Sequence, residues 1–170
     1  QAHTDFWEVT QDGLDWALEK CGVDGDAELR ERLLSLYWEL QAYPEVPEML
    51  QTLKAAGLNT AILSNGSHNM LDGAVQSAGI KTLLDDNLSV QSVGIFKPDS
   101  RVYDLVGQRF GCAKDEVLFV SSNGWDAAGA TGYGFTTAWV NRSGEPMDRM
   151  PWKPKHVLRD LIDIPKIVGL

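Results

Sequence analysis

Three short polar stretches of this chain each follow an apolar run and carry side chains suited to chemistry. They are Ser64-Asn65, Lys97-Pro98-Asp99 and residues 121–126, which read Ser-Ser-Asn-Gly-Trp-Asp. If the apolar runs are parallel strands of an α/β sheet, their carboxyl ends share one edge, and ligands bind at that edge in such folds. The sequence therefore predicts one pocket that combines a lysine, a carboxylate, hydroxyl groups and amides, a set of groups typical of a catalytic site.

The first stretch ends the apolar run 58–63 and turns into a helix. Ser64, Asn65 and the backbone N–H groups at the start of that helix would form a cradle for an anion. The alternative is that Ser64 or Ser67 only caps the helix, a common role for serine at a helix start. The residues alone leave both interpretations open.

Lys97 is the candidate cation of the predicted pocket. Because Pro98 follows it, the backbone of Lys97 is biased toward extended conformations. The preceding Ile95 and Phe96 favour a partly buried amine, which needs an anionic partner. The alternative is an ordinary solvated lysine.

Residues 121–126 are the most specific of the three stretches. They place two hydroxyls, an amide, an indole and a carboxylate directly after the apolar run 117–120. Asp126 could instead only cap the helix that follows. Because so many polar groups gather at the end of a buried strand, we favour a functional role.

The composition argues against several kinds of partner. With 15 Lys and Arg against 24 Asp and Glu, the formal net charge of −9 disfavours nucleic acid and anionic membranes, which require a positive protein face. No apolar run reaches the roughly 18 residues of a membrane-spanning helix. Cys21 and Cys112 lie far apart and are expected to be reduced thiols, as in a cytoplasmic protein.

The apolar pattern divides the chain near residue 43. Residues 1–43 show helical periodicity over 6–21 and 26–40, which predicts a small helical cap. Residues 44–170 alternate apolar runs with helical stretches, so we expect an α/β core with a parallel sheet and helices on both faces. The expected strands are 58–63, 88–90, 117–120 and 136–140, the expected helices are 47–56, 70–78, 100–110 and 126–131, and residues 141–155 are expected to be irregular.

Taken in order, the three stretches resemble the haloacid dehalogenase superfamily, and most closely its L-2-haloacid dehalogenases. The resemblance extends from Asp5-Phe6-Trp7 to Val140-Asn141-Arg142. Phosphatases of this superfamily carry further acidic residues in the third stretch, which bind Mg²⁺ together with a nucleophilic aspartate. Here the corresponding residues are Ser and Asn, and a hard divalent cation needs several anionic oxygen ligands. We therefore expect no metal.

The resemblance implies a Rossmann-like, HAD-like core over 44–170, a cap over 1–43, and hydrolysis of L-2-haloalkanoic acids to D-2-hydroxyalkanoic acids without a cofactor. In that reaction an aspartate attacks the halogen-bearing carbon, displaces halide with inversion and forms an ester that water hydrolyses. Lys97 would offset the negative charges of nucleophile and substrate. Ser121, Asn123 and Asp126 would orient Lys97 and the hydrolytic water. The implied substrate-binding residues are Ser64 for the carboxylate, Asn65 for the halide, and Phe6, Tyr103 and Trp125 for the alkyl group.

Two parts of the family pattern have no match in this sequence. They are the nucleophilic aspartate, in a motif shaped like Asp-x-x-Gly-Thr, and the halide-binding arginine; Asp5 and Asp12 lie in helical sequence instead. The resemblance implies that both precede Gln1 in a longer protein. We therefore expect the sheet to lack its central strand and to leave an apolar slot. A chain without that strand is expected to fold poorly or aggregate.

Two other functions remain open. One is a Mg²⁺-dependent phosphatase of the same superfamily, because the Ser/Lys/Asp layout is shared. The other is an inactive remnant that acts as a binding module, because the nucleophile is missing. The expected partners are a small anionic 2-haloacid and halide. The resemblance also implies a homodimer, for which Trp7, Trp16 and Trp38 could form an interface, although they could equally form the core of the cap.

Overall fold

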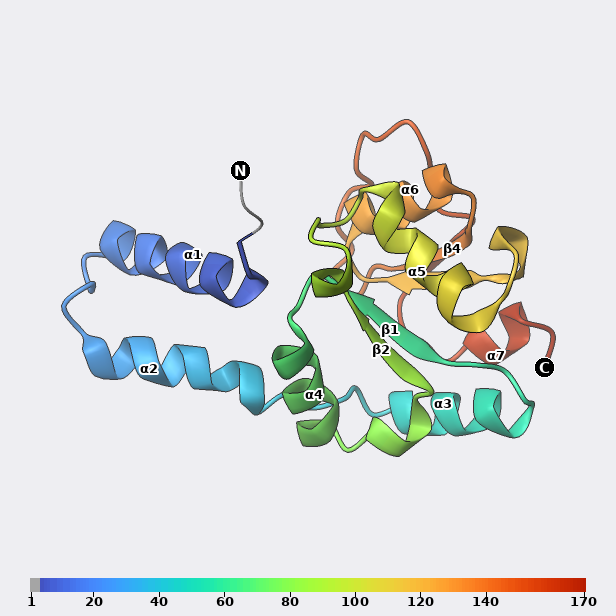
Figure 1. Cartoon of the computed structure of the whole chain (residues 1–170), viewed down its shortest axis with the longest axis horizontal. Coiled ribbons are helices and arrows are strands. Elements are labelled where there is room, and N and C mark those ends of the chain that lie inside the picture. The colour runs from blue at the N-terminus through green and yellow to red at the C-terminus, as the bar shows by residue number, and fades with distance from the viewer. Residues whose placement is uncertain (1–3) are drawn as a thin grey trace.

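The computed structural model describes residues 4–170, and its strands form two parallel sheets (Figure 1). In the first sheet, β1 (Ala61–Ser64) pairs with β2 (Asp86–Ser89). In the second, β4 (Thr136–Val140) lies between β3 (Leu118–Ser121) and β5 (His156–Leu158). All pairs are parallel, which confirms the predicted α/β class.

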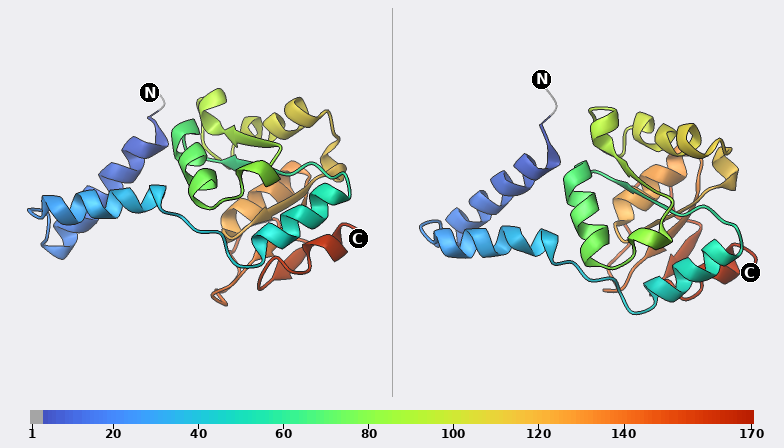
Figure 2. Two further views of the ribbon diagram at one scale, coloured as in Figure 1. Left: turned by 90° about the horizontal axis from the view of Figure 1, so that it is seen from below. Right: turned by 60° about the horizontal axis from the view of Figure 1, so that its bottom comes forward.

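Helices cover both faces of the strands (Figure 2). On one face, α5 (Ser100–Phe110) and α6 (Gly124–Tyr133) build an aromatic core with Phe119 of β3. On the other, α3 (Val46–Ala55) and α7 (Ile164–Ile167) pack against the opposite side of the same strands. The two cores follow from strand alternation, since successive side chains point to opposite faces. The neighbours Phe119 and Leu118 accordingly belong to different cores.

The remaining core elements complete the alternation of strands and helices. The first sheet is accompanied by α4 (His68–Ser77), which contacts β2. Single 3₁₀ turns lie at Lys81–Leu83, Val90–Ser92 and Lys114–Glu116. Each predicted strand and helix of the core is present, although β1 begins later than expected. The sequence analysis does not predict β5 and α7, because three or four residues are too few to show a period.

The segment predicted to form a cap contains a hairpin of two helices that extends away from the strands (Figure 1). It consists of α1 (Phe6–Cys21) and α2 (Ala27–Ser35), followed by a 3₁₀ turn at Leu36–Trp38. The predicted second helix therefore ends earlier than residue 40. Asp5 and Asp26 accept hydrogen bonds from the first backbone N–H groups of their helices, as N-cap residues do. None of the helices within residues 4–170 is long and apolar enough to cross a membrane.

Aromatic side chains attach the cap to the core. The rings of Phe6 and Phe96 meet edge to face with 5.9 Å between their centroids. Trp38 contacts Trp7 within the cap, with centroids 5.8 Å apart, and lies against Gly73 of α4. Trp16, in contrast, is 61% exposed. Trp7 and Trp38 thus pack against each other, whereas Trp16 lies at the surface.

The sheet is interrupted between β1 and β3. Within residues 4–170, β1 is hydrogen-bonded only to β2, and β3 only to β4. Val120, in the middle of β3, is 36% exposed although it is apolar. The expected interruption is therefore present, and poor folding of the isolated chain stays a prediction.

The contact between Trp38 and Gly73 leads to a prediction about the cap. A Cβ at Gly73 would lie 2.3 Å from an atom of the Trp38 ring, so Gly73→Ala is expected to displace that ring and lower the free energy of unfolding by about 1–3 kcal/mol. Thermal unfolding and limited proteolysis of the cap would measure this. Gly13→Ala in α1 is the matched control, because nothing lies within 4 Å of its Cβ position. Equal stability of the two variants would contradict the prediction.

Candidate active site

A buried ion pair lies at the carboxyl ends of the strands. Lys97 Nζ donates to Asp126 Oδ2 at 2.7 Å and to the backbone carbonyl of Leu63 at 3.0 Å. The side chains of Lys97 and Asp126 are 9% and 3% exposed. Lys97 precedes α5, Asp126 lies in the first turn of α6, and Leu63 belongs to β1. Segments far apart in the sequence therefore meet at one point.

Asp126 accepts hydrogen bonds at both carboxylate oxygens. Ser121 Oγ donates to Oδ2 at 3.0 Å and the Tyr103 hydroxyl donates to Oδ1 at 3.1 Å. Burial, followed by the charge of Asp126, raises the pKa of Tyr103 far above its usual range. Tyr103 therefore remains a hydrogen-bond donor, and the carboxylate of Asp126 is held in a fixed orientation. The alternative that Asp126 only caps its helix is wrong, because its bonds go to side chains of other segments.

Lys97 is also held through its backbone. Its backbone N–H donates to Asn65 Oδ1 at 2.9 Å. The side-chain nitrogen of Asn65 takes no part in this hydrogen bond. Lys97 Nζ lies 5.4 Å from the centroid of the Phe119 ring. The ammonium thus has a carboxylate, a carbonyl and an aromatic ring around it, and the alternative of a solvated surface lysine is wrong.

The capping interpretation of the serines after β1 is confirmed for Ser67. Ser67 accepts a hydrogen bond from the Met70 N–H at 3.4 Å and so caps α4. Ser64 Oγ accepts from the Gly66 N–H at 3.0 Å and shapes the turn instead. The role of Ser64 in holding a substrate carboxylate stays a prediction.

The predicted alkyl-binding residues are distributed around this centre. Tyr103 is fully buried, and the centroid of its ring lies 5.8 Å from that of Phe119. Its hydrogen bond to Asp126 is observed, whereas its contact with an alkyl group stays a prediction. Phe6 stands at the start of α1. Trp125, which is 37% exposed, lines a cavity of about 600 Å³ together with Asn123. Lys97 and Asp126 do not line this cavity.

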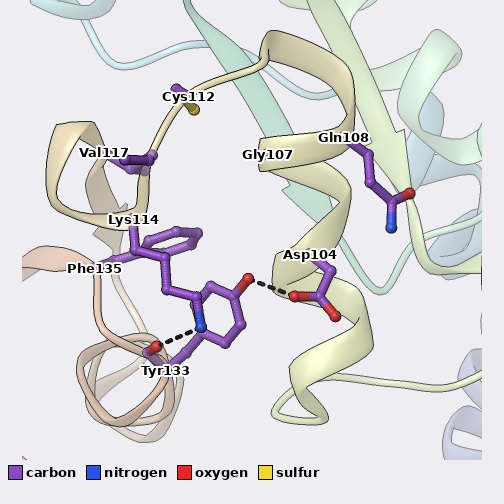
Figure 3. Close-up of a pocket in the computed structure, with 9 residues that line it drawn as sticks. Asp104, Gly107, Gln108, Cys112, Lys114, Val117, Tyr133 and Phe135 are labelled. Atoms are coloured by element: carbon purple, nitrogen blue, oxygen red, sulfur yellow. Dashed lines mark hydrogen bonds between the residues drawn. The ribbon is translucent and has the colours of Figure 1, made fainter.

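A second cavity, of about 280 Å³, lies between α5 and the loop 111–117 (Figure 3). It is lined by Asp104, Lys114 and Tyr133 among others, and by none of the predicted site residues. Figure 3 shows the Tyr133 hydroxyl directed at Asp104 and the Lys114 ammonium at the Tyr133 carbonyl. Because no predicted site residue lines this cavity, it is distinct from the candidate active site.

Tyr133 provides a prediction about pH. Burial, followed by its 2.5 Å hydrogen bond to Asp104, raises the pKa of Tyr133 from 10.0 to about 12. The folded state thus holds this proton more tightly than the unfolded chain. Its contribution to stability is complete below pH 10 and is lost as the pH rises toward 12.

We expect the difference in free energy of unfolding between the protein and Tyr133→Phe to shrink over that pH window, as measured by urea unfolding. Tyr37→Phe in the cap is the control. A difference that stays constant up to pH 12 would contradict the assigned bond.

The donor set around Lys97 does not suit a hard divalent cation. Such ions require several anionic oxygens, whereas Asp126 is the one carboxylate that bonds Lys97 within residues 4–170. Over the same residues, no group of three or more His, Cys, Asp or Glu side chains is arranged to hold a metal ion. Lys97 is the cation that pairs with Asp126.

Comparison with known proteins supports a family assignment. The family model of haloacid dehalogenase-like hydrolases matches residues 2–134. (S)-2-haloacid dehalogenase 1 of Pseudomonas sp. (strain CBS-3) is 42% identical over 166 residues, which cover 98% of this chain and 73% of that relative. The (S)-2-haloacid dehalogenase of Pseudomonas sp. (strain YL) is 43% identical over 152 residues, covering 89% and 66%.

Solved structures agree with the sequence comparison. A crystal structure of an L-2-haloacid dehalogenase superposes with a TM-score of 0.94 at 39% identity, covering 99% of this chain and 74% of the other. The Xanthobacter autotrophicus enzyme with chloropropionic acid covalently bound gives 0.88 at 34% identity, covering 99% and 78%. From its sequence and its fold alike, this chain belongs to the haloacid dehalogenase-like hydrolase family, among the L-2-haloacid dehalogenases.

Proposed function

We propose that the protein hydrolyses L-2-haloalkanoic acids to D-2-hydroxyalkanoic acids. The observation that carries the proposal is the buried ion pair of Lys97 and Asp126, which supplies a fixed cation where a metal-dependent relative would need several carboxylates. The names of the relatives, which describe (S)-2-haloacid and L-2-haloacid dehalogenases, support the same reaction.

The chemistry requires two carboxylates to meet. The oxygen of an enzyme aspartate attacks C2 of the substrate, the carbon–halogen bond breaks, and halide leaves with the bonding electrons. Water then adds to the ester carbonyl, which releases the hydroxy acid, a proton and the original carboxylate. Bringing the two carboxylates together out of water costs several kcal/mol unless a cation is near. Lys97, with one N–H beyond its bonds to Asp126 and Leu63, supplies that cation.

The substrate-binding roles that we propose are those that the family resemblance implies. Ser64 and the N–H groups after β1 would bind the substrate carboxylate. Asn65, whose Oδ1 already holds the Lys97 backbone, would direct its amide N–H groups at the departing halide. Ser121, Asn123 and Asp126 would orient the hydrolytic water. The alkyl group would lie among Phe6, Tyr103 and Trp125.

We place the attacking aspartate on a strand between β1 and β3, in a segment before Gln1. Each of these strands is paired on one side only within the described residues. Lys97 joins Leu63 of β1 to Asp126, which follows β3. An aspartate at the end of an intervening strand would lie beside the ammonium.

The cap and the cell context complete the proposal. Residues 1–43 would act as a lid that excludes water until the ester forms, over a core of residues 44–170. The exposed Trp16 would belong to a homodimer interface. Cys21 and Cys112 are both free thiols, which supports a cytoplasmic setting.

The test measures chloride release from L-2-chloropropionate by the protein as isolated, with EDTA present. The intact mass of the protein is recorded before the assay. We expect a mass above the 18.8 kDa of these residues, EDTA-resistant chloride release, and no reaction of the D enantiomer. Phosphate release from phosphate esters that depends on Mg²⁺ would favour the phosphatase instead. A protein with the larger mass that catalyses neither reaction would favour the binding module.

A further inference from the structure

Gly129, in the middle of α6, lies against Pro98 and Tyr103. A Cβ built at Gly129 would lie 2.8 Å from Pro98 Cβ and 3.0 Å from the Tyr103 hydroxyl oxygen. Real Cβ atoms essentially never approach another heavy atom below 3.0 Å. Neither neighbour is free to move away, because Pro98 is constrained by its ring and Tyr103 is fully buried and bonded to Asp126.

Both of these neighbours are attached to the ion pair. Pro98 directly follows Lys97 in the chain, and the Tyr103 hydroxyl donates to Asp126 Oδ1. Asp126 itself lies three residues before Gly129 on α6, and residues three apart share one face of a helix. A side chain at Gly129 would therefore push on the lysine side and the carboxylate side of the pair together.

We infer that Gly129 is a positioning residue of the active site. Its missing side chain lets α6 pack against Pro98 and Tyr103 closely enough for Asp126 Oδ2 to reach Lys97 Nζ at 2.7 Å. The effect on catalysis rests on the proposed function, whereas the effect on the geometry of the ion pair does not.

The same helix offers a matched control. Gly132 stands one turn further along α6, and its Cβ would also meet a side chain, the ring of Trp152, at 2.6 Å. Trp152 is 50% exposed and can turn into solvent. Gly129→Ala and Gly132→Ala therefore make the same change in helix propensity, and only the first disturbs the ion pair.

The experiment compares kcat and KM for halide release in the two variants. A displacement on the order of 1 Å at a reacting group can cost about 100-fold, so we expect Gly129→Ala to lower kcat by about that factor with little change in KM. The kcat of Gly132→Ala is expected to stay within about twofold of that of the unsubstituted protein, since the disturbed Trp152 ring has no assigned role in the site. Equal kcat values for the two variants would overturn the inference.

A second readout does not depend on activity. The Tyr103 hydroxyl proton, buried and bonded to Asp126, should give a slowly exchanging proton NMR signal that Tyr103→Phe removes. We expect Gly129→Ala to shift or abolish that signal and Gly132→Ala to keep it. If the signal responds in this way but the unsubstituted protein releases no halide, the proposed function fails and the positioning of the pair stands. A signal unchanged in Gly129→Ala overturns the inference.

A double substitution covers the case in which Gly129→Ala does not fold. Tyr103→Phe removes the hydroxyl oxygen that the new Cβ would meet at 3.0 Å, so Gly129→Ala is better tolerated in that background. The approach of 2.8 Å to Pro98 Cβ remains, so the new Cβ would still push on the lysine side of the ion pair. We expect the double variant to have a lower kcat than Tyr103→Phe alone, and equal kcat values for these two proteins would overturn the inference.

Discussion

Lys97→Met is expected to reduce halide release by about 1000-fold, the scale on which removal of a preorganised charge-stabilising donor acts in a buried site. Lys97 donates to Asp126 at 2.7 Å from a side chain that is only 9% exposed. Methionine keeps the unbranched shape and most of the packing, without the ammonium and its charge. Without the ammonium, the nucleophile and the substrate carboxylate repel each other with no nearby cation. The measurement is kcat/KM for chloride release from L-2-chloropropionate.

Stability must be separated from catalysis in this experiment. Removing one partner of a buried ion pair costs about 3–5 kcal/mol, although Asp126 retains its bonds from Ser121 and Tyr103. The folded fraction is therefore measured by circular dichroism at the assay temperature. Lys81→Met, at an exposed lysine outside the site, is the control. A folded Lys97→Met protein with activity within tenfold of the control would remove Lys97 from the mechanism.

The second large effect is expected at Asp126. Asp126→Ala leaves the Lys97 ammonium with the Leu63 carbonyl as its remaining hydrogen-bond acceptor within the described residues. It also deprives Ser121 and Tyr103 of their acceptor. We expect halide release to fall by about 1000-fold or more and the free energy of unfolding to fall by about 3–5 kcal/mol.

Asp126→Asn distinguishes charge from hydrogen bonding. Asparagine keeps one acceptor oxygen and the shape of the side chain, so it is expected to fold better than the alanine variant and to remain nearly inactive. Thermal unfolding and chloride release, measured on both variants, provide the comparison. An active Asp126→Asn protein would show that the negative charge is dispensable and that Asp126 has a purely structural role.

The sequence predicts much of this site because its residues follow strands. Lys97, Ser121 and Asp126 converge as expected, since the carboxyl ends of parallel strands share one edge. The hydrogen bond that Lys97 donates to Leu63 ends on a backbone carbonyl, and no side chain in the sequence signals it. The full burial of Tyr103 depends on how α5 is rotated against β3, which helical periodicity does not specify.

Other features of the structure could not be predicted from the sequence for related reasons. The close approach at Gly129 depends on the distance between two segments, and a glycine in a helix by itself indicates only a cost in helix propensity. The elements β5 and α7 are too short to show periodicity. The predicted domain division at residue 43, in contrast, rests on a change of pattern that is visible over many residues.

The contact between Lys97 and Asp126 has a consequence for how the molecule assembles. Within the described residues, β1 and β2 come from one contiguous part of the chain, and β3, β4 and β5 come from another. The contact between Lys97 and Asp126, like the packing of Leu63 against the aromatic core, joins the two parts. We therefore expect the ion pair to form late in assembly, once these two parts and the proposed strand between them have come together. A molecule in which the two parts are not yet joined would then lack the ion pair on which the proposed activity depends.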